Sequence, residues 1–359
     1  MLNTYYFDAA AHEPPSPAAV KAFTRALPLG NPSALHAYGV AAKNALEKAR
    51  ASIAQDLNCL PEEVYFTSGA TESCNWMMES LEAVCTHFKF PRNYEHHAVL
   101  EYPPFPSPHR AARTGFTHML ANNETGEIYD ILSMRRNAPN ALFACDATAA
   151  VGQIPVDFKA LGVDYLAFGA HKFGGISGIG CLIVKKDTPL IPVIRGGGQE
   201  WGKRAGTESV ALACAMAAAL HDRMGNMISD MKRIARCRDM LITYLVRFVP
   251  DTYVNGPYTP GDVLLRLPGN ANLSFLGVES QALVMALSAE GVYASSGSAC
   301  TSGEADGSYV LRAMGYPASR AVSAVRFTLP YTVTEDDVLG AVPLIVSAVE
   351  NLRRLTPTP

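Results

Sequence analysis

The first 250 residues alternate between short apolar runs and longer stretches in which an apolar residue recurs every three or four positions. The runs predict buried strands at 64–67, 141–145, 163–168 and 180–184. Helical spacing appears over 46–57. A turn at 68–70 precedes a second predicted helix over 71–85, and a long helix of about 25 residues ends near Pro250. Strands that alternate with helices predict an α/β fold with a mostly parallel sheet flanked by helices.

The pattern changes after Pro250, where the turn-forming stretches Asn255-Gly256-Pro257 and Pro260-Gly261 appear. The elements predicted beyond them are a strand at 272–275, a helix at 279–289, a strand at 325–329 and a final helix at 335–355. A chain of 359 residues is long enough for two domains. We therefore predict a large domain over 13–249 and a smaller α+β domain formed by 1–12 and 250–359.

Composition narrows the class of protein. The net charge of −3 offers no basic surface for nucleic acid or an anionic membrane. The most apolar stretch, 210–220, is about half the length of a membrane crossing, and the N-terminus does not resemble a signal peptide. Eight cysteines without a CxxC pair argue against a disulfide framework and a zinc site. These features predict a cytoplasmic protein without a metal centre.

Lys172 follows an apolar strand and precedes two glycines in the segment Phe168-Gly-Ala-His-Lys-Phe-Gly-Gly. Lysine is seldom buried without a partner. On this segment alone, two interpretations stay open. The residue is either an exposed lysine at a strand end or an amine that forms a Schiff base.

Two further segments favour the second interpretation. Asp146 ends another strand of the same predicted sheet, and α/β sheets bind ligands at the carboxyl ends of their strands. A carboxylate beside a Schiff-base lysine can pair with the protonated pyridine nitrogen of pyridoxal phosphate. The turn at 67–72 opens a helix, where N–H groups and the Ser68 and Thr71 hydroxyls suit a phosphate. A plain helix cap formed by Thr71 accounts for that turn equally well.

Several short motifs resemble, in order, those of the NifS/IscS-like cysteine desulfurases, which are pyridoxal-phosphate enzymes of fold type I in aminotransferase class V. The matching positions are 31–33, 68–73, 95–96, 122–124, 146–148, 171–172, 204–207, 295–301 and 325–327. The resemblance covers nearly the whole chain. It implies a fold type I pyridoxal-phosphate transferase with a large domain and a smaller α+β domain.

The resemblance also implies the catalytic residues. Lys172 would form the Schiff base with the cofactor, and Asp146 would pair with the pyridine nitrogen. His96 would stack on the ring and handle a proton, while Cys300 would receive the sulfur. His97 would point away from His96 if this segment is a strand, so the two histidines are not expected to form a metal site.

The remaining site residues follow from the same resemblance. The cofactor contacts would come from Ala70, Thr71, Asn123, His171 and Thr207. Thr71 and His171 would hold the phosphate, and Thr207 would reach in from a second subunit, which implies a homodimer. Arg326 and Asn123 would orient the substrate, with a bidentate contact from Arg326 to the α-carboxylate.

The activity implied is conversion of L-cysteine to L-alanine, with sulfur transferred to Cys300 as a persulfide and then to an acceptor protein. Such acceptors include iron–sulfur scaffolds and thiolation enzymes. Cys300 lies among small polar residues at 295–303, and a loop of this composition suits a thiol that must travel between two partners. The alternative, an inert small hydrophobe, is a poor match for this polar loop.

Four departures from the family pattern stand out. Ala149 occupies the place of a glutamine, Gly169 that of a serine, and 9–12 read Ala-Ala-Ala-His where Ala-Thr-Thr is usual. Only 25 residues separate His96 from Asn122, and a proline-rich stretch at 102–108 stands where a helix and a strand are expected. This shortening predicts a narrower sheet with one wall of the site open. We hypothesise that a partner protein or the second subunit covers that wall and that the isolated chain has low activity.

Three functions therefore remain. Cysteine desulfurase is favoured because the chemically essential residues are all present. A selenocysteine lyase or another class V enzyme would use the same residues. A degenerate, non-catalytic sulfur-relay or scaffold protein is favoured only by Ala149, Gly169 and the shortened segment.

Overall fold

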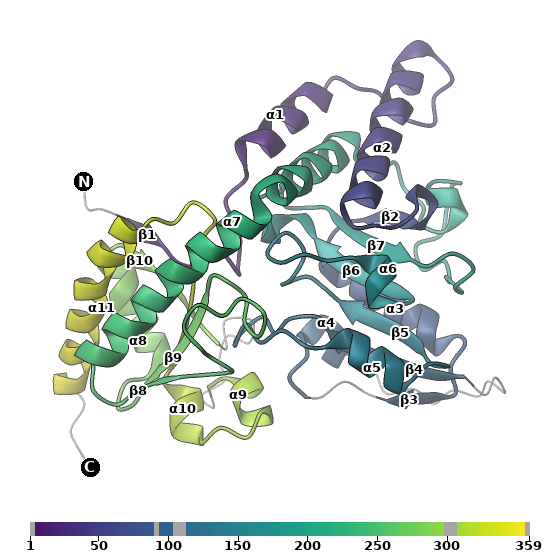
Figure 1. Ribbon diagram of the computed structural model, residues 1–359. Helices are drawn as coiled ribbons and strands as arrows, with labels where there is room; N and C mark the ends of the chain where they lie inside the picture. Colours follow the sequence, from purple (N-terminus) through teal and green to yellow (C-terminus); the bar gives the residue numbers. More distant parts are fainter. Residues whose placement is uncertain (1–3, 90–92, 103–112, 298–306, 356–359) are drawn as a thin grey trace.

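The computed structural model describes residues 4–89, 93–102, 113–297 and 307–355 (Figure 1). Its centre is a six-stranded sheet in the order β2 (Val64–Thr67), β7 (Gly180–Val184), β6 (Tyr165–Gly169), β5 (Leu142–Asp146), β4 (Thr114–Met119) and β3 (His87–Lys89). Neighbouring strands from β3 to β6 run parallel, whereas β7 is antiparallel to both β6 and β2. The predicted mostly parallel sheet is confirmed.

Both faces of this sheet are buried, which explains why its strands read as continuous apolar runs. In β5, Phe143 and Cys145 face a core that also contains residues of α2 (Ala37–Asp56). The alternate residues Leu142 and Ala144 face a second core, which contains residues of α3 (Ala70–Glu82). Helices therefore cover both faces, as the sequence predicts.

A second part of the molecule contains an antiparallel sheet in the order β11 (Ser295–Ser296), β12 (Ala324–Thr328), β9 (Asn270–Phe275) and β8 (Thr252–Val254). With α8 (Ser280–Ala289) and α11 (Glu335–Leu355), it surrounds a core of its own. The N-terminal strand β1 (Tyr5–Tyr6) pairs with β10 (Val292–Tyr293), so the first residues lie with the C-terminal part.

The long helix α7 (Val210–Phe248) connects the two parts (Figure 1). It has 39 residues, so the prediction of about 25 was too short. Its first half packs between the sheet and α1 (Pro17–Ala26), and side chains from Ile234 onward belong to the second core. The first half of α7 is buried on several sides and therefore carries apolar residues on several sides. As a result, the recurrence of apolar residues every three or four positions is not visible in this part of the sequence.

The remaining elements are short. They are α4 (His97–Leu100), α5 (Ile131–Asn137), α6 (Phe158–Leu161), α9 (Tyr309–Ala313), α10 (Ala318–Val322) and the 3-10 turns η1 (Pro61–Glu63), η2 (Ala170–Lys172) and η3 (Glu200–Gly202). The shortened segment after His96 holds α4 and β4, and the prolines at 103–108 lie outside the described residues. Within the described ranges, no helix has the length and apolar character needed to span a membrane.

Candidate active site

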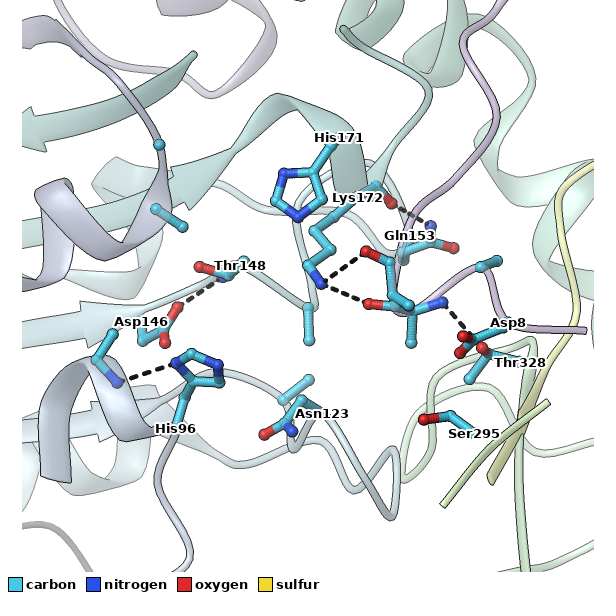
Figure 2. Close-up of a pocket in the computed structure, with 18 of the residues that line it drawn as sticks. Asp8, His96, Asn123, Asp146, Thr148, Gln153, His171, Lys172, Ser295 and Thr328 are labelled. Carbon is cyan, nitrogen blue, oxygen red and sulfur yellow. Dashed lines mark hydrogen bonds between the residues drawn. The ribbon is translucent and has the colours of Figure 1, made fainter. Parts of the chain in front are cut away.

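A cavity of about 690 Å³ lies where the carboxyl ends of β5 and β6 face the second sheet (Figure 2). Eight of the predicted site residues line it: Ala70, Thr71, His96, Asn123, Asp146, His171, Lys172 and Arg326. Thr207 is exposed and does not line this cavity. Cys300 lies outside the described residues, although Gly297, three positions before it, is part of the cavity wall.

Lys172 reaches into the cavity from η2, the turn that follows β6 (Figure 2). Its Nζ donates to the carbonyl oxygens of Ala10 and Ala11 at 2.5 and 3.3 Å. The Lys172 carbonyl in turn accepts from Gln153 Nε2 at 2.9 Å. The half-buried amine is therefore held at a defined place in the cavity, which differs from the exposed strand-end lysine that the sequence also allowed.

Asp146 and His96 lie together across the cavity from the segment 8–11 (Figure 2). Asp146 is 6% exposed, and its Oδ1 accepts from the Thr148 amide at 2.9 Å. Burial lowers the pKa of His96, and the charge of Lys172 lowers it further, while Asp146 opposes both. The imidazole is therefore neutral at pH 7. Its Nδ1 accepts from the Ala98 amide at 3.1 Å, so the proton resides on Nε2.

The conditional assignment of His96 and His97 to a strand is wrong, because His96 is the N-cap of α4. His97 follows in that helix, and its Nδ1 lies 3.1 Å from Glu101 Oε1. Its ring centroid lies 4.6 Å from that of Tyr309. The two histidines thus diverge because a helix begins between them, and not because strand neighbours alternate.

The start of α3 forms a cradle of backbone donors beside Lys172. Gly69 is the N-cap and supplies no side-chain acceptor, so the alternative in which Thr71 caps the helix is wrong. The first N–H groups of a helix lack partners within it, and Ala70 and Thr71, which open this helix, line the cavity. Glu72 fixes this turn by accepting from the Ser68 amide at 2.7 Å and from Arg204.

His171 lies on the other side of this cradle, at the edge of the cavity (Figure 2). Burial, followed by the charges of Lys172 and His12, lowers the pKa of His171 to about 4. The ring is therefore neutral and can donate one hydrogen bond. A Cβ on Gly169 would lie 3.2 Å from Ala70 Cβ and 3.3 Å from the Ala70 nitrogen, so glycine lets α3 approach β6 closely here.

Arg326 projects from β12 on the side of the second sheet and is 8% exposed. Its Nη1 donates to the Asn123 carbonyl at 2.9 Å, and its Nη2 donates to Asp8 Oδ1 at 3.0 Å. Arg326 Nε and Asn123 Oδ1 are buried and have no hydrogen-bond partner among the described residues. Such orphaned groups indicate a site that a polar ligand completes.

The donor set fits pyridoxal phosphate. The helix start and neutral His171 suit a phosphate, Asp146 suits a pyridinium nitrogen, and Lys172 provides an amine for the aldehyde. The guanidinium of Arg326 suits an α-carboxylate on the opposite side.

Asp8 and Gln153 are among the cavity residues that the sequence did not predict. Asp8 pairs with Arg326 across 318 positions of the chain, and no local pattern signals such a contact. Gln153 lines the cavity four positions after Ala149, where the expected glutamine is missing.

The comparisons with known proteins agree with this geometry. The family model for class-V aminotransferases matches residues 5–101 and 112–339, and the chain therefore belongs to that family, whose members depend on pyridoxal phosphate. It is 36% identical over 357 residues to the cysteine desulfurase IscS of Dictyoglomus turgidum, covering 91% of this chain and 89% of the relative. It is 35% identical over 385 residues to an IscS-like cysteine desulfurase of Mycobacterium tuberculosis, covering 97% of each.

A solved structure of a NifS-like protein superposes with a TM-score of 0.86 at 26% identity, covering 97% of this chain and 100% of that one. The resemblance to NifS/IscS-like proteins and the fold type I architecture, both predicted from the motifs, are confirmed.

Proposed function

We propose that this chain is a pyridoxal-phosphate-dependent cysteine desulfurase that releases L-alanine from L-cysteine and transfers the sulfur to Cys300. One observation carries the proposal: Lys172, Asp146 and His96 share a single cavity with Arg326, and the wall of that cavity includes Gly297, three positions before Cys300. The names of the relatives, which are 32 to 36% identical, support the same activity.

When bound, pyridoxal phosphate supplies an electron sink for charge that develops at the substrate Cα. Lys172 holds the cofactor, and its amine then removes the Cα proton. Asp146 keeps the pyridine nitrogen protonated. The neutral His96, which lines the cavity and carries its proton on Nε2, would serve as a proton donor.

Arg326 binds the substrate α-carboxylate, and Asn123 Oδ1 accepts from the substrate or the cofactor. The Cys300 thiolate attacks the substrate sulfur, which forms an S–S bond and breaks the Cβ–S bond. The electron pair of that bond stays with Cβ, which takes up a proton to become the methyl group of alanine.

We further propose a homodimer in which Thr207 completes the phosphate site of the partner subunit. Its exposure outside its own cavity supports this role. Large apolar side chains are exposed in the loop before α2, in the first turn of α2 and in the segment before Thr207, as expected of a surface that a second copy covers. Examples are Leu35 at 98%, Tyr38 at 69% and Trp201 at 51% exposure.

The sulfur acceptor is proposed to be a protein, and the setting cytoplasmic. The seven described cysteines are all free, which is consistent with a reducing compartment. We also propose the domain division at 13–249 against 1–12 and 250–359. It is supported by the separate second core, although α7 contributes side chains to both cores.

The proposal is tested with the purified chain, pyridoxal phosphate and L-cysteine. A yellow protein that releases alanine is expected, and Cys300→Ala should stay yellow but release none. A chain that binds the cofactor without turnover of L-cysteine would instead be the non-catalytic relay protein. Selenocysteine used in strong preference to cysteine would identify a selenocysteine lyase.

A further inference from the structure

Glu124 is a buried carboxylic acid next to Asn123, and the mechanism above gives it no role. It is 1% exposed, and its Oε2 accepts from Ser308 Oγ at 2.5 Å. Its Oε1 has no hydrogen-bond partner within the described part of the chain. Burying a carboxyl group that lacks a full set of hydrogen-bond partners costs free energy of folding, so the group is expected to have a role that offsets this cost.

The Glu124 carboxyl contacts both ends of the segment that carries Cys300. Ser308 is the second described residue after that segment, and Gly297 is the last one before it. A Cβ on Gly297 would lie 2.4 Å from Glu124 Oε2, which is closer than real atoms approach. The same Cβ would lie 2.9 Å from Ser308 Cβ, and Gly297 does not have a positive φ, so a side chain at this position would displace the Glu124 carboxyl or Ser308.

The residues that follow the Cys300 segment, Ser308 and Tyr309, also contact the turn that carries His96. Ser308 is the N-cap of α9, where its Oγ accepts from the Leu311 amide at 3.0 Å. The next residue, Tyr309, donates from its hydroxyl to the Glu95 carbonyl at 2.8 Å. The residues that close the segment therefore contact the loop of Asn123 and the turn of His96 at once.

The main chain of Glu124 is held independently of its side chain. Its carbonyl accepts from the side chains of Asn270 and Asn272 on β9 at 3.0 and 3.1 Å, and its amide donates to Asn122 Oδ1 at 2.9 Å. Asn272 is the register partner of Arg326. Removal of the carboxyl alone should therefore leave the Asn123 loop and Arg326 in place.

We propose that Glu124 is a positioning residue for sulfur transfer, which fixes the two ends of the Cys300 segment relative to the bound substrate. The inference rests on the proposed function and deepens it. In the step concerned, the Cys300 thiolate forms the S–S bond while the Cβ–S bond breaks and Cβ gains a proton. Glu124 touches none of these atoms and acts through its contacts with Gly297 and Ser308.

The test uses the full chain loaded with pyridoxal phosphate and compares two reactions. Exchange of the Cα hydrogen of L-alanine with D₂O requires Lys172 and Arg326 but involves no sulfur. Alanine release from L-cysteine also requires Cys300. A misplacement of about 1 Å can slow a reaction by about 100-fold. Glu124→Ala should therefore slow alanine release by about 10- to 100-fold while Cα exchange stays within about twofold of wild type.

Matched variants separate shape from charge. Glu124→Gln keeps an oxygen that accepts from Ser308, and it should retain alanine release within about threefold of wild type. Gly297→Ala should slow release in the wild-type background, with little further loss when combined with Glu124→Ala. Hydrogen exchange of the Leu311 amide, a readout independent of turnover, should be faster in Glu124→Ala than in Glu124→Gln.

Two results would overturn the inference alone: unchanged alanine release in Glu124→Ala, or an equal loss in both reactions, which would place the effect at Arg326 or the cofactor. Failure of the proposed function looks different. In that case the wild-type chain exchanges the Cα hydrogen of alanine but never releases alanine from cysteine.

Discussion

Glu95 precedes His96, the proposed proton donor, and its burial leads to a quantitative prediction for the stability of the fold. The side chain is fully buried, and its Oε1 accepts from the Met119 amide at 2.9 Å. Burial, and to a lesser extent the charge of Asp146, raises the pKa of Glu95 to about 8. The group is therefore protonated at pH 7.

The raised pKa links Glu95 to stability. Between the unfolded value of 4.5 and about 8, the folded chain binds the proton more tightly than the unfolded chain. The stability associated with this proton is present below pH 4.5 and is lost as pH rises through about 8. At about 1.4 kcal/mol per pKa unit, the loss is on the order of 5 kcal/mol at most.

Glu95→Gln is neutral at every pH and can still accept from the Met119 amide. Between pH 5 and pH 9 the free energy of unfolding should therefore fall less in Glu95→Gln than in wild type. The two decreases should differ by about 2–5 kcal/mol. Urea unfolding of the apoprotein at fixed concentration measures this difference, with Glu62→Gln on the exposed surface as the matched control. The same pH dependence in wild type and Glu95→Gln would refute the reasoning.

Three further predictions concern the cavity. Arg326→Lys, which loses the two-pronged donor, should lower kcat/KM for L-cysteine by about 10- to 100-fold with the yellow colour retained; a change below threefold would argue against the carboxylate contact. Gln153→Met, which removes the bond to the Lys172 carbonyl, should lower kcat by about 2- to 10-fold and shift the pH at which the cofactor absorbance changes; an unaltered titration would count against this. Gly169→Ser should weaken pyridoxal-phosphate binding, measured by titration, because its Cβ crowds Ala70 at 3.2 Å; tighter binding would contradict this.

The sequence predicted best the elements that are buried on both faces. The strand predicted at 180–184 matches β7 at both ends. Every residue of β7 is buried, so the strand appears in the sequence as an uninterrupted run of small and apolar residues. The period of α7 was lost where its first half is enclosed on several sides. The hydroxyl of Thr71 suggested that this residue caps α3, but the N-cap is Gly69. Glycine has no side chain to bond the first N–H groups of the helix.

The candidate site shows the same division. Asp146 was identified because it ends an apolar strand and Lys172 because it closely follows one, and a polar residue at either place is unusual as pure structure. Asp8 and Glu124 were not assigned roles, because their partners Arg326 and Ser308 lie far along the chain. Contacts of this kind follow from tertiary packing and have no local sequence pattern.

The central claim is that sulfur moves from L-cysteine to Cys300 at this cavity. The most direct measurement is the mass of the chain after one turnover with L-cysteine and pyridoxal phosphate, together with the alanine formed. The account predicts one added sulfur atom on the peptide that contains Cys300, in amounts equal to alanine, and neither product in Cys300→Ala. Alanine formed at the wild-type rate by Cys300→Ala, or sulfur found only on another cysteine, would contradict it.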